Sequence, residues 1–378
     1  MSDSLGIKDF LEPVSLKIIS NNKEYKDGQI GKTIEVFDQY FPDFSESDLI
    51  LVGCDEERGI GMGEKSKYAP DIIRAEFYRL YYWHKDIKLA DAGNIRTGSS
   101  LNDTYIALKT VIAELTGLGK TVVILGGSHD LTLAQYYANV DKKKVIEATA
   151  VDALIDIDIE SLNRAENFLM EMLTGEPNYM RHYNHIGFQS FYVHPHMLET
   201  MDKLRFDCFR VGSVKENIEE MEPVIRNSDI FSFDISSIAH MAAPANYLSP
   251  NGFDGQEACT LMRYAGFSHN IASVGIYGYD PEKDIDNLTA RQISHMIWYL
   301  IDGKSRGRRE SDLDQRESFL EYHTAFAEVE TTFLQSRKTN RWWMQLPDKK
   351  YIACSYKDYL LASSNQIPER WLRAQERG

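Results

Sequence analysis

Acidic residues follow an apolar run near the middle of the chain. The stretch 149-TAVDALID-156 begins as a β-rich run and then presents Asp152 and Asp156. Carboxylates at the end of such a run are typical ligands of divalent cations. Leu154, midway between the two aspartates, has no donor atom. The stretch is therefore a metal site, the remainder of one, or a chance spacing, and other parts of the chain must decide.

Two further apolar runs end in polar residues. In 126-GGSHD-130, two glycines allow a sharp turn that presents His129, and 232-SFDIS-236 carries Asp234. In open α/β sheets, ligands collect where the carboxyl ends of the parallel strands meet. We therefore expect His129, Asp152, Asp156 and Asp234 to converge on one site.

The elements that must position these residues follow a regular order. Apolar runs typical of strands alternate with segments of helical period. Strands that are apolar throughout are typical of a parallel sheet covered on both faces. The alternation predicts an α/β fold, a three-layer α/β/α sandwich around a mainly parallel sheet. The predicted strands are 49–53, 121–125, 146–155, 185–191, 229–235 and 272–279, and the predicted helices are 71–83, 102–119 and 289–303.

The composition changes after Gly303, which we expect to end the last of these helices. Residues 304–318 are charged and contain few apolar residues. Beyond them, 319–335 has helical spacing, whereas 341–347 and 351–356 have the pattern of short strands. We divide the chain into an N-terminal extension (1–45), an α/β domain (46–303) and a C-terminal appendage (304–378) packed on the core or on a neighbouring subunit.

Aromatic and basic residues gather in this appendage. Trp342 and Trp343 lie close to Arg337, Lys338 and Arg341, a composition found in nucleic-acid patches. The net charge of −15 opposes that interpretation, since nucleic acids and anionic membranes require a basic face. We expect the two tryptophans to be buried against the core or a neighbouring subunit instead.

Composition also restricts where the protein works. No run of about 18 apolar residues occurs, so no membrane-spanning segment is expected. The first 13 residues lack the basic start and apolar stretch of a secretory signal. Four widely spaced cysteines without a C-x-x-C pair fit a reduced environment and no thiolate zinc site. These features predict a cytoplasmic globular protein that binds neither nucleic acid nor membrane.

The three polar strand ends resemble the motifs of the ureohydrolase superfamily, which contains arginase, agmatinase and formimidoylglutamase. The family motifs G-G-D-H, D-A-H-x-D and S-F-D-x-D together hold two manganese ions, and here they stand as 126-GGSH-129, 152-DALID-156 and 232-SFDIS-236. The resemblance spans about residues 48–302 in the family's order. Further matching segments are 69-APDIIR-74, 186-IGFQS-190, 243-APAN-246, 254-DGQEACTLMRYAG-266 and 280-DPEKDIDNLTAR-291.

The resemblance implies a role for each matching residue. One manganese ion would be held by His129, Asp152, Asp156 and Asp234, all of which are present. The other ion needs a histidine and a carboxylate at the positions of Leu154 and Ser236. Leucine cannot bind a metal ion, and a serine hydroxyl is a poor replacement for a carboxylate. Catalytic roles are implied for Asp156 and Glu257, and substrate contacts for Glu257 and Asn246.

Several interpretations remain open on the sequence. The first is an arginase-fold module with lost or much reduced C–N hydrolase activity and a binding or assembly role. The second is a single-metal hydrolase of a formimidoylglutamate-like amidine. The third is an oligomer scaffold in which the C-terminal appendage carries the function. We expect at most one Mn²⁺, a small amidine or amino-acid-like ligand, and a homo-oligomer. The aspartates could also pair with helix N-termini or arginines without metal, His129 could be a core histidine, and Glu257 a helix N-terminal acid.

Overall fold

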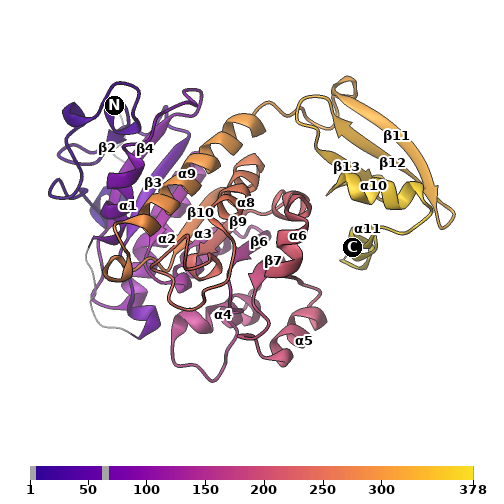
Figure 1. Ribbon diagram of the computed structural model, residues 1–378, viewed down its shortest axis with the longest axis horizontal. Helices are drawn as coiled ribbons and strands as arrows, with labels where there is room; N and C mark the ends of the chain where they lie inside the picture. Colours follow the sequence, from indigo (N-terminus) through magenta and orange to yellow (C-terminus); the bar gives the residue numbers. More distant parts are fainter. Residues whose placement is uncertain (1–5, 62–67, 378) are drawn as a thin grey trace.

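The core of the protein is one large, mainly parallel sheet (Figure 1). The computed structural model describes residues 6–61 and 68–377. Residues 1–5, which belong to the N-terminal stretch in which no secretory signal is expected, lie outside the described residues. Within the described residues the sheet has ten strands in the order β1-β4-β3-β5-β10-β9-β6-β7-β8, with β2 also paired to β4. Only the β1–β4 pairing is antiparallel among them. The strands are β1 Leu11–Glu12, β2 Glu35–Val36, β3 Leu49–Cys54, β4 Leu89–Ile95, β5 Thr121–Gly126, β6 Ile146–Val151, β7 Met180–Phe188, β8 Asp207–Arg210, β9 Ile230–Asp234 and β10 Ser273–Tyr277.

Helices cover both faces of this sheet, because successive strand residues point to opposite sides. Leu49 and Leu51 of β3 pack with helices α1, α8 and α9, whereas Ile50 and Val52 pack with α2, α3 and α4. The predicted α/β/α sandwich is thus confirmed. The core helices are α1 Ala69–Phe77, α2 Leu101–Gly117, α3 Thr132–Val140, α4 Phe168–Thr174, α5 Pro195–Lys203, α6 Val211–Glu216, α7 Met221–Ile225, α8 Gly255–Phe267 and α9 Leu288–Gly307. No helix of the described chain is long and apolar enough to cross a bilayer.

Residues 6–45 contribute two short strands to the sheet. Leu11 pairs with Ile95, and Glu35 pairs with Ala90, so β1 and β2 both flank β4. The sequence pattern did not predict β4, whose 89-LADAGNI-95 contains an aspartate and an asparagine. Arg74 compensates the buried charge of Asp91, with its Nε 2.7 Å from Asp91 Oδ2.

The C-terminal residues form a second, antiparallel sheet that lies beside the core (Figure 1). The helix predicted for 319–335 is wrong, because this segment is the hairpin of β11 and β12. Burial alternates along β11 with a period of two, and Ala327 and Glu328 turn the chain with positive φ values of 46° and 64°. The predicted short strands are confirmed. The elements are β11 Phe319–Phe326, β12 Val329–Ser336, β13 Trp342–Gln345, β14 Tyr351–Cys354, α10 Tyr356–Ser363 and α11 Glu369–Arg377.

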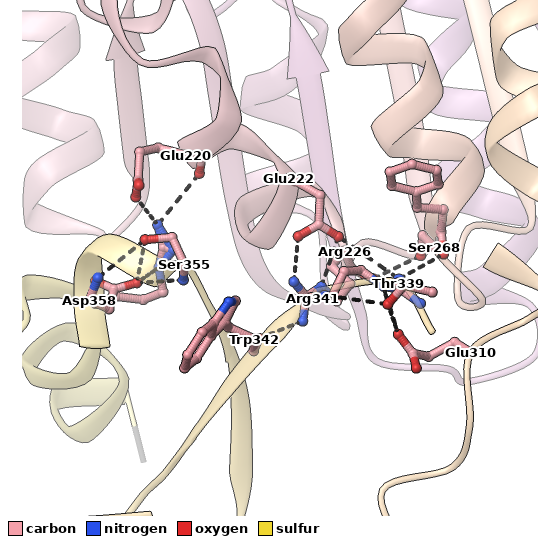
Figure 2. A network of polar contacts seen from close by, with 12 residues as sticks. Glu220, Glu222, Arg226, Ser268, Glu310, Thr339, Arg341, Trp342, Ser355 and Asp358 are labelled. Carbon is pink, nitrogen blue, oxygen red and sulfur yellow. Dashed lines mark hydrogen bonds and ion pairs between the residues drawn. The ribbon is translucent and has the colours of Figure 1, made fainter. Parts of the chain in front are cut away.

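Buried aromatic and charged side chains attach this C-terminal unit to the core (Figure 2). Trp342 and Trp343 are buried, but they pack among apolar residues of the C-terminal unit itself rather than against the core or a neighbouring subunit as expected. Arg226 of the core donates to the Trp342 carbonyl oxygen at 2.8 Å and lies 4.5 Å above the Trp343 ring. Arg226 also pairs with Glu222, so its charge is compensated inside the junction.

The last core helix does not end at Gly303, and that prediction is wrong. Helix α9 continues to Gly307, past the composition change. Gly303 lies instead where α9 crosses α8, and a Cβ there would come within 2.2 Å of the Arg263 carbonyl oxygen and 3.0 Å of the Gly266 Cα. Glycine therefore permits close packing of the two helices rather than terminating one.

This crossing predicts a clear stability effect. Gly303→Ala should lower the free energy of unfolding by about 1–3 kcal/mol, because the methyl group overpacks a rigid backbone contact. The matched control is Gly212→Ala in α6, where a Cβ meets nothing within 4 Å. Helix propensity should make that control neutral or slightly stabilising. Urea unfolding measures both; equal stabilities of the two variants would contradict the tight crossing.

Candidate metal centre at the carboxyl edge of the sheet

The parallel register brings three distant segments to one edge of the sheet. Cys54 of β3 pairs with Gly126 of β5, and Tyr277 of β10 pairs with Asp234 of β9, so these strands end at the same level. Gly127 makes the turn after β5 possible, because a Cβ there would lie 2.0 Å from the Glu56 carbonyl oxygen. His129 follows in the 3₁₀ turn His129–Leu131.

His129, Asp152 and Asp156 form one compact group. The His129 Nδ1 atom lies 2.9 Å from Asp152 Oδ2 and 3.0 Å from Asp156 Oδ2. Their ligand atoms all lie within 4.8 Å of one another, and the three residues are at most 5 % exposed. Among the described residues this is the one group of histidines, cysteines and acids with such spacing. It fits a single divalent ion, and its carboxylates suit Mn²⁺ or Mg²⁺ better than zinc.

Asp234 lies next to this group without belonging to it. Its Oδ1 accepts a hydrogen bond of 2.7 Å from the Ser236 backbone N–H. Burial and then the charge of Asp152 raise the pKa of Asp234 to about 6. Asp234 is therefore close enough to Asp152 to feel its charge, but it lies outside the group whose ligand atoms are within 4.8 Å of one another.

Protonation of His129 offsets the negative charge of the group. Burial would lower the pKa of His129, but hydrogen bonds with Asp152 and Asp156 outweigh it and hold that pKa well above its usual range. Burial would raise the pKa of Asp152, but the hydrogen bond with His129 lowers it to about 2. Burial and the charge of Asp152 raise the pKa of Asp156. A protonated His129 thus pairs with Asp152, beside a carboxyl group that favours its neutral form.

At the positions of the family's second histidine and its last carboxylate, this chain has Leu154 and Ser236. The Ser236 hydroxyl donates to Asp152 Oδ1, and the Leu154 backbone N–H donates to the same oxygen at 3.2 Å. Two donors therefore occupy the carboxylate oxygen that faces away from His129. Leu154 adds an apolar side chain at the position of the missing histidine. The residues present do not fit a second ion here.

Residues around the group fix its orientation, and the sequence analysis missed them. The His129 Nε2 atom lies 3.1 Å from the Ser232 hydroxyl, so the Nδ1 atom faces the carboxylates. His185 Nε2 lies 3.2 Å from the Asp152 carbonyl oxygen, and Tyr183 OH lies 3.2 Å from His185 Nδ1. Ser232 could have been found, since it stands two residues before Asp234 and so on the same strand face. The sequence analysis placed His185 in the predicted strand 185–191, but nothing in the pattern linked it to Asp152.

Glu257 and Asn246 already have structural partners. The Asn246 side-chain amide donates to the backbone oxygens of Ser236, Ile238 and Ser249 at 3.0, 2.5 and 3.3 Å. Glu257 forms a capping box with Asp254 at the start of α8 and pairs with Lys215. The substrate-binding and catalytic roles implied for these two residues stay predictions, and each side chain has a sufficient structural reason to be there.

Comparison with known proteins identifies the family. The sequence model described as the arginase family matches residues 47–302, and the chain belongs to this family. It is 21% identical over 271 residues to a formimidoylglutamase of Macrococcus caseolyticus, covering 67% of this chain and 84% of the relative. It is 24% identical over 286 residues to a formimidoylglutamase of Vibrio cholerae, covering 67% and 83%.

Solved structures show the same fold. The formiminoglutamase of Trypanosoma cruzi, a structure with Mn²⁺, superposes with a TM-score of 0.63 and 17% identity over 70% of this chain and 95% of that one. The formimidoylglutamase of Bacillus subtilis gives a TM-score of 0.65 and 17% identity over 74% and 94%. The agmatine ureohydrolase of Thermoplasma volcanium gives 0.61 and 20% over 76% and 98%. These likenesses establish an arginase-like core.

A further buried carboxylate lies at this edge and makes stability depend on pH. Asp55 follows the last residue of β3, and burial, then the charge of Glu57, raises its pKa to about 8. The unfolded chain has an ordinary aspartate pKa near 3.9. Between these values the folded state binds the extra proton, so the contribution of Asp55 to stability is present at low pH and lost as pH rises toward 8.

Asp55→Asn should remove this dependence. We expect the free energy of unfolding at pH 8 to rise by at least about 1.4 kcal/mol, the equivalent of one pKa unit, with little change near pH 4. Urea unfolding at several pH values measures the effect. Asp348→Asn is the control, because that carboxylate is exposed and its pKa is lowered by a hydrogen bond with Lys350. A parallel shift of Asp55→Asn at both pH values would contradict the assignment.

Proposed function

We propose that this protein is an arginase-family member in which C–N hydrolysis is lost or much reduced and which serves a binding or assembly role. The observation that supports this proposal is the hydrogen bond from the Ser236 hydroxyl to Asp152 Oδ1. It occupies the side of Asp152 that a second ion would share in the family's site. Leu154 stands beside it without a donor.

The chemistry of the family explains why this half of the site matters. Two ions together lower the pKa of a bound water and place it against the substrate carbon. The residues that remain here can hold one ion through His129, Asp152 and Asp156, without the bridging geometry that aims the nucleophile. Activity should therefore fall even where an ion is bound.

The same proposal gives the ligands and setting of the protein. At most one Mn²⁺ is expected, held by the three-residue group with Asp234 nearby. The retained fold suits a small amidine or amino-acid-like ligand, and assembly is expected as a homo-oligomer in the cytoplasm. The acidic net charge opposes nucleic-acid and anionic-membrane partners.

Turnover and metal content test the proposal together. Hydrolysis of formimidoylglutamate, agmatine and arginine with Mn²⁺ should be far below about 1 s⁻¹, the lower end of ordinary enzyme rates. Leu154→His combined with Ser236→Asp should raise the bound metal from at most one ion to two, because both missing donors return. The single substitutions are the controls, and neither should reach two ions. Turnover of the unmodified protein at about 1–10³ s⁻¹ on any of these substrates would refute the loss of activity.

A second candidate is a single-ion hydrolase of an amidine substrate. Its supporting observation is the spacing of His129, Asp152 and Asp156, whose ligand atoms all lie within 4.8 Å of one another. A bound ion would supply Lewis acidity and lower the pKa of its water. Formimidoylglutamases among the relatives make a formimidoyl amidine the first substrate to try.

Metal binding itself is tested by thermal melting. Mn²⁺ should stabilise the folded protein against chelator by about 2.7 kcal/mol at a hundredfold excess over Kd, because only the folded chain presents the group. Asp156→Asn should abolish this gain by removing one ligand. Asp158→Asn is the control, since Asp158 lies outside the group and should leave the shift intact. If millimolar Mn²⁺ leaves the melting temperature of the unmodified protein unchanged, the group is a structural ion pair.

A further inference from the structure

Two basic segments that are distant in sequence meet at the junction between the core and the C-terminal unit. Arg306 lies in the last turn of α9 and Arg309 follows that helix, whereas Lys338 and Arg341 lie in the turn between β12 and β13. Together they line a cavity of about 540 Å³. Figure 2 shows Arg341 and Thr339 of this turn next to Glu310.

Positive charge exceeds negative charge around this cavity. Four arginine and lysine residues line it, against one acid, Asp302. Asp302 is already engaged, with its carboxylate 3.0 Å from Arg306 Nε and 3.1 Å from His84 Nε2. The protein as a whole has a net charge of −15, so this local excess runs against its composition.

Two of the four cations have no carboxylate partner within the described chain. Arg341 is compensated by Glu310 at 3.1 Å. The Lys338 ammonium donates to the neutral Ser311 hydroxyl at 2.6 Å. For the Arg309 guanidinium, the described residues provide neither a hydrogen bond nor an ion pair. The positive charges of Lys338 and Arg309 are therefore offset only by solvent or by a bound anion.

From the cavity and its converging cations we infer that this junction binds a small polyanion carrying phosphate or carboxylate groups. Arginine presents a planar fork that binds either group through two parallel hydrogen bonds, and lysine adds a point charge. The volume lies within the range of small-molecule sites. The ligand would contact α9 and the β12–β13 turn together, and so bind the C-terminal unit more firmly to the core.

This site is separate from the metal centre. Lys304, in the same turn of α9 as Arg306, donates to the hydroxyl of Thr121, the first residue of β5. His129 follows the last residue of β5, so the two sites lie at opposite edges of the sheet. Binding at the junction therefore does not depend on the proposed loss of hydrolysis.

Calorimetric titration of the full-length protein with inorganic pyrophosphate, and separately with citrate, tests the inference at about 0.15 M ionic strength, where the Debye length is about 8 Å. At least one of the two should bind and should raise the melting temperature. Tighter binding of pyrophosphate would assign a phosphate compound, and tighter binding of citrate a polycarboxylate. Arg309→Gln with Lys338→Gln should weaken that binding at least about tenfold, since both cations lose their charge-assisted hydrogen bonds. Both side chains are exposed, so the variant should fold normally.

The matched control is Lys349→Gln with Lys350→Gln, two exposed lysines in the turn between β13 and β14. It removes the same two charges but should change the affinity less than about twofold, because long-range effects of exposed charges are screened. Equal weakening in both double variants would show a general charge effect and overturn the inference. Failure of both anions to bind the unmodified protein at millimolar concentration would also overturn it.

Discussion

Buried negative charge at the carboxyl edge of the sheet is the constraint on which this structure depends. Asp152 and Asp156 are almost fully buried, and both contact the same imidazole. Two carboxylates cannot both ionise in such a place without a positive charge. His129 supplies that charge from the turn after β5, with Nδ1 within 3.0 Å of both side chains. The parallel register of the strands and the turn at Gly127 together place the imidazole beside the two carboxylates.

The differences from the family motifs preserve this balance. A serine at position 236 has one negative charge fewer than a carboxylate, and its hydroxyl satisfies Asp152 as a donor. Leu154 leaves its backbone N–H pointing at the same oxygen. The two changes act together, because an aspartate at position 236 would add a buried negative charge that a second ion or a bound proton would have to neutralise. In the proposed function, loss of the second ion and loss of its ligands are therefore one electrostatic change.

The C-terminal unit uses charge for attachment rather than chemistry. Arg226 pairs with Glu222, stacks on Trp343 and donates to the Trp342 backbone, so a buried cation joins the two sheets. Arg341 pairs with Glu310 in the same junction. The protein contains two different electrostatic environments: an acid-rich group at the carboxyl edge of the core sheet, and a base-rich cavity at the junction between the core and the C-terminal unit.

The sequence by itself determined the layered core and the chemistry of the carboxyl edge. Fully apolar strands such as β3 and β5 have one stable environment, a sheet covered on both faces, and polar residues after such strands must gather where the strands end. It failed where local pattern and tertiary context disagree. Residues 319–335 have apolar positions compatible with a helix, yet pairing of β11 with β12 and packing on Trp342 favour a hairpin. Gly303 has the sequence pattern of a helix end, and its packing role becomes visible only from its contact with the neighbouring helix α8. The contacts of Ser236 with Asp152 and of Ser232 with His129 were likewise decided by the tertiary structure, since the partners come from strands that meet only after the sheet has formed.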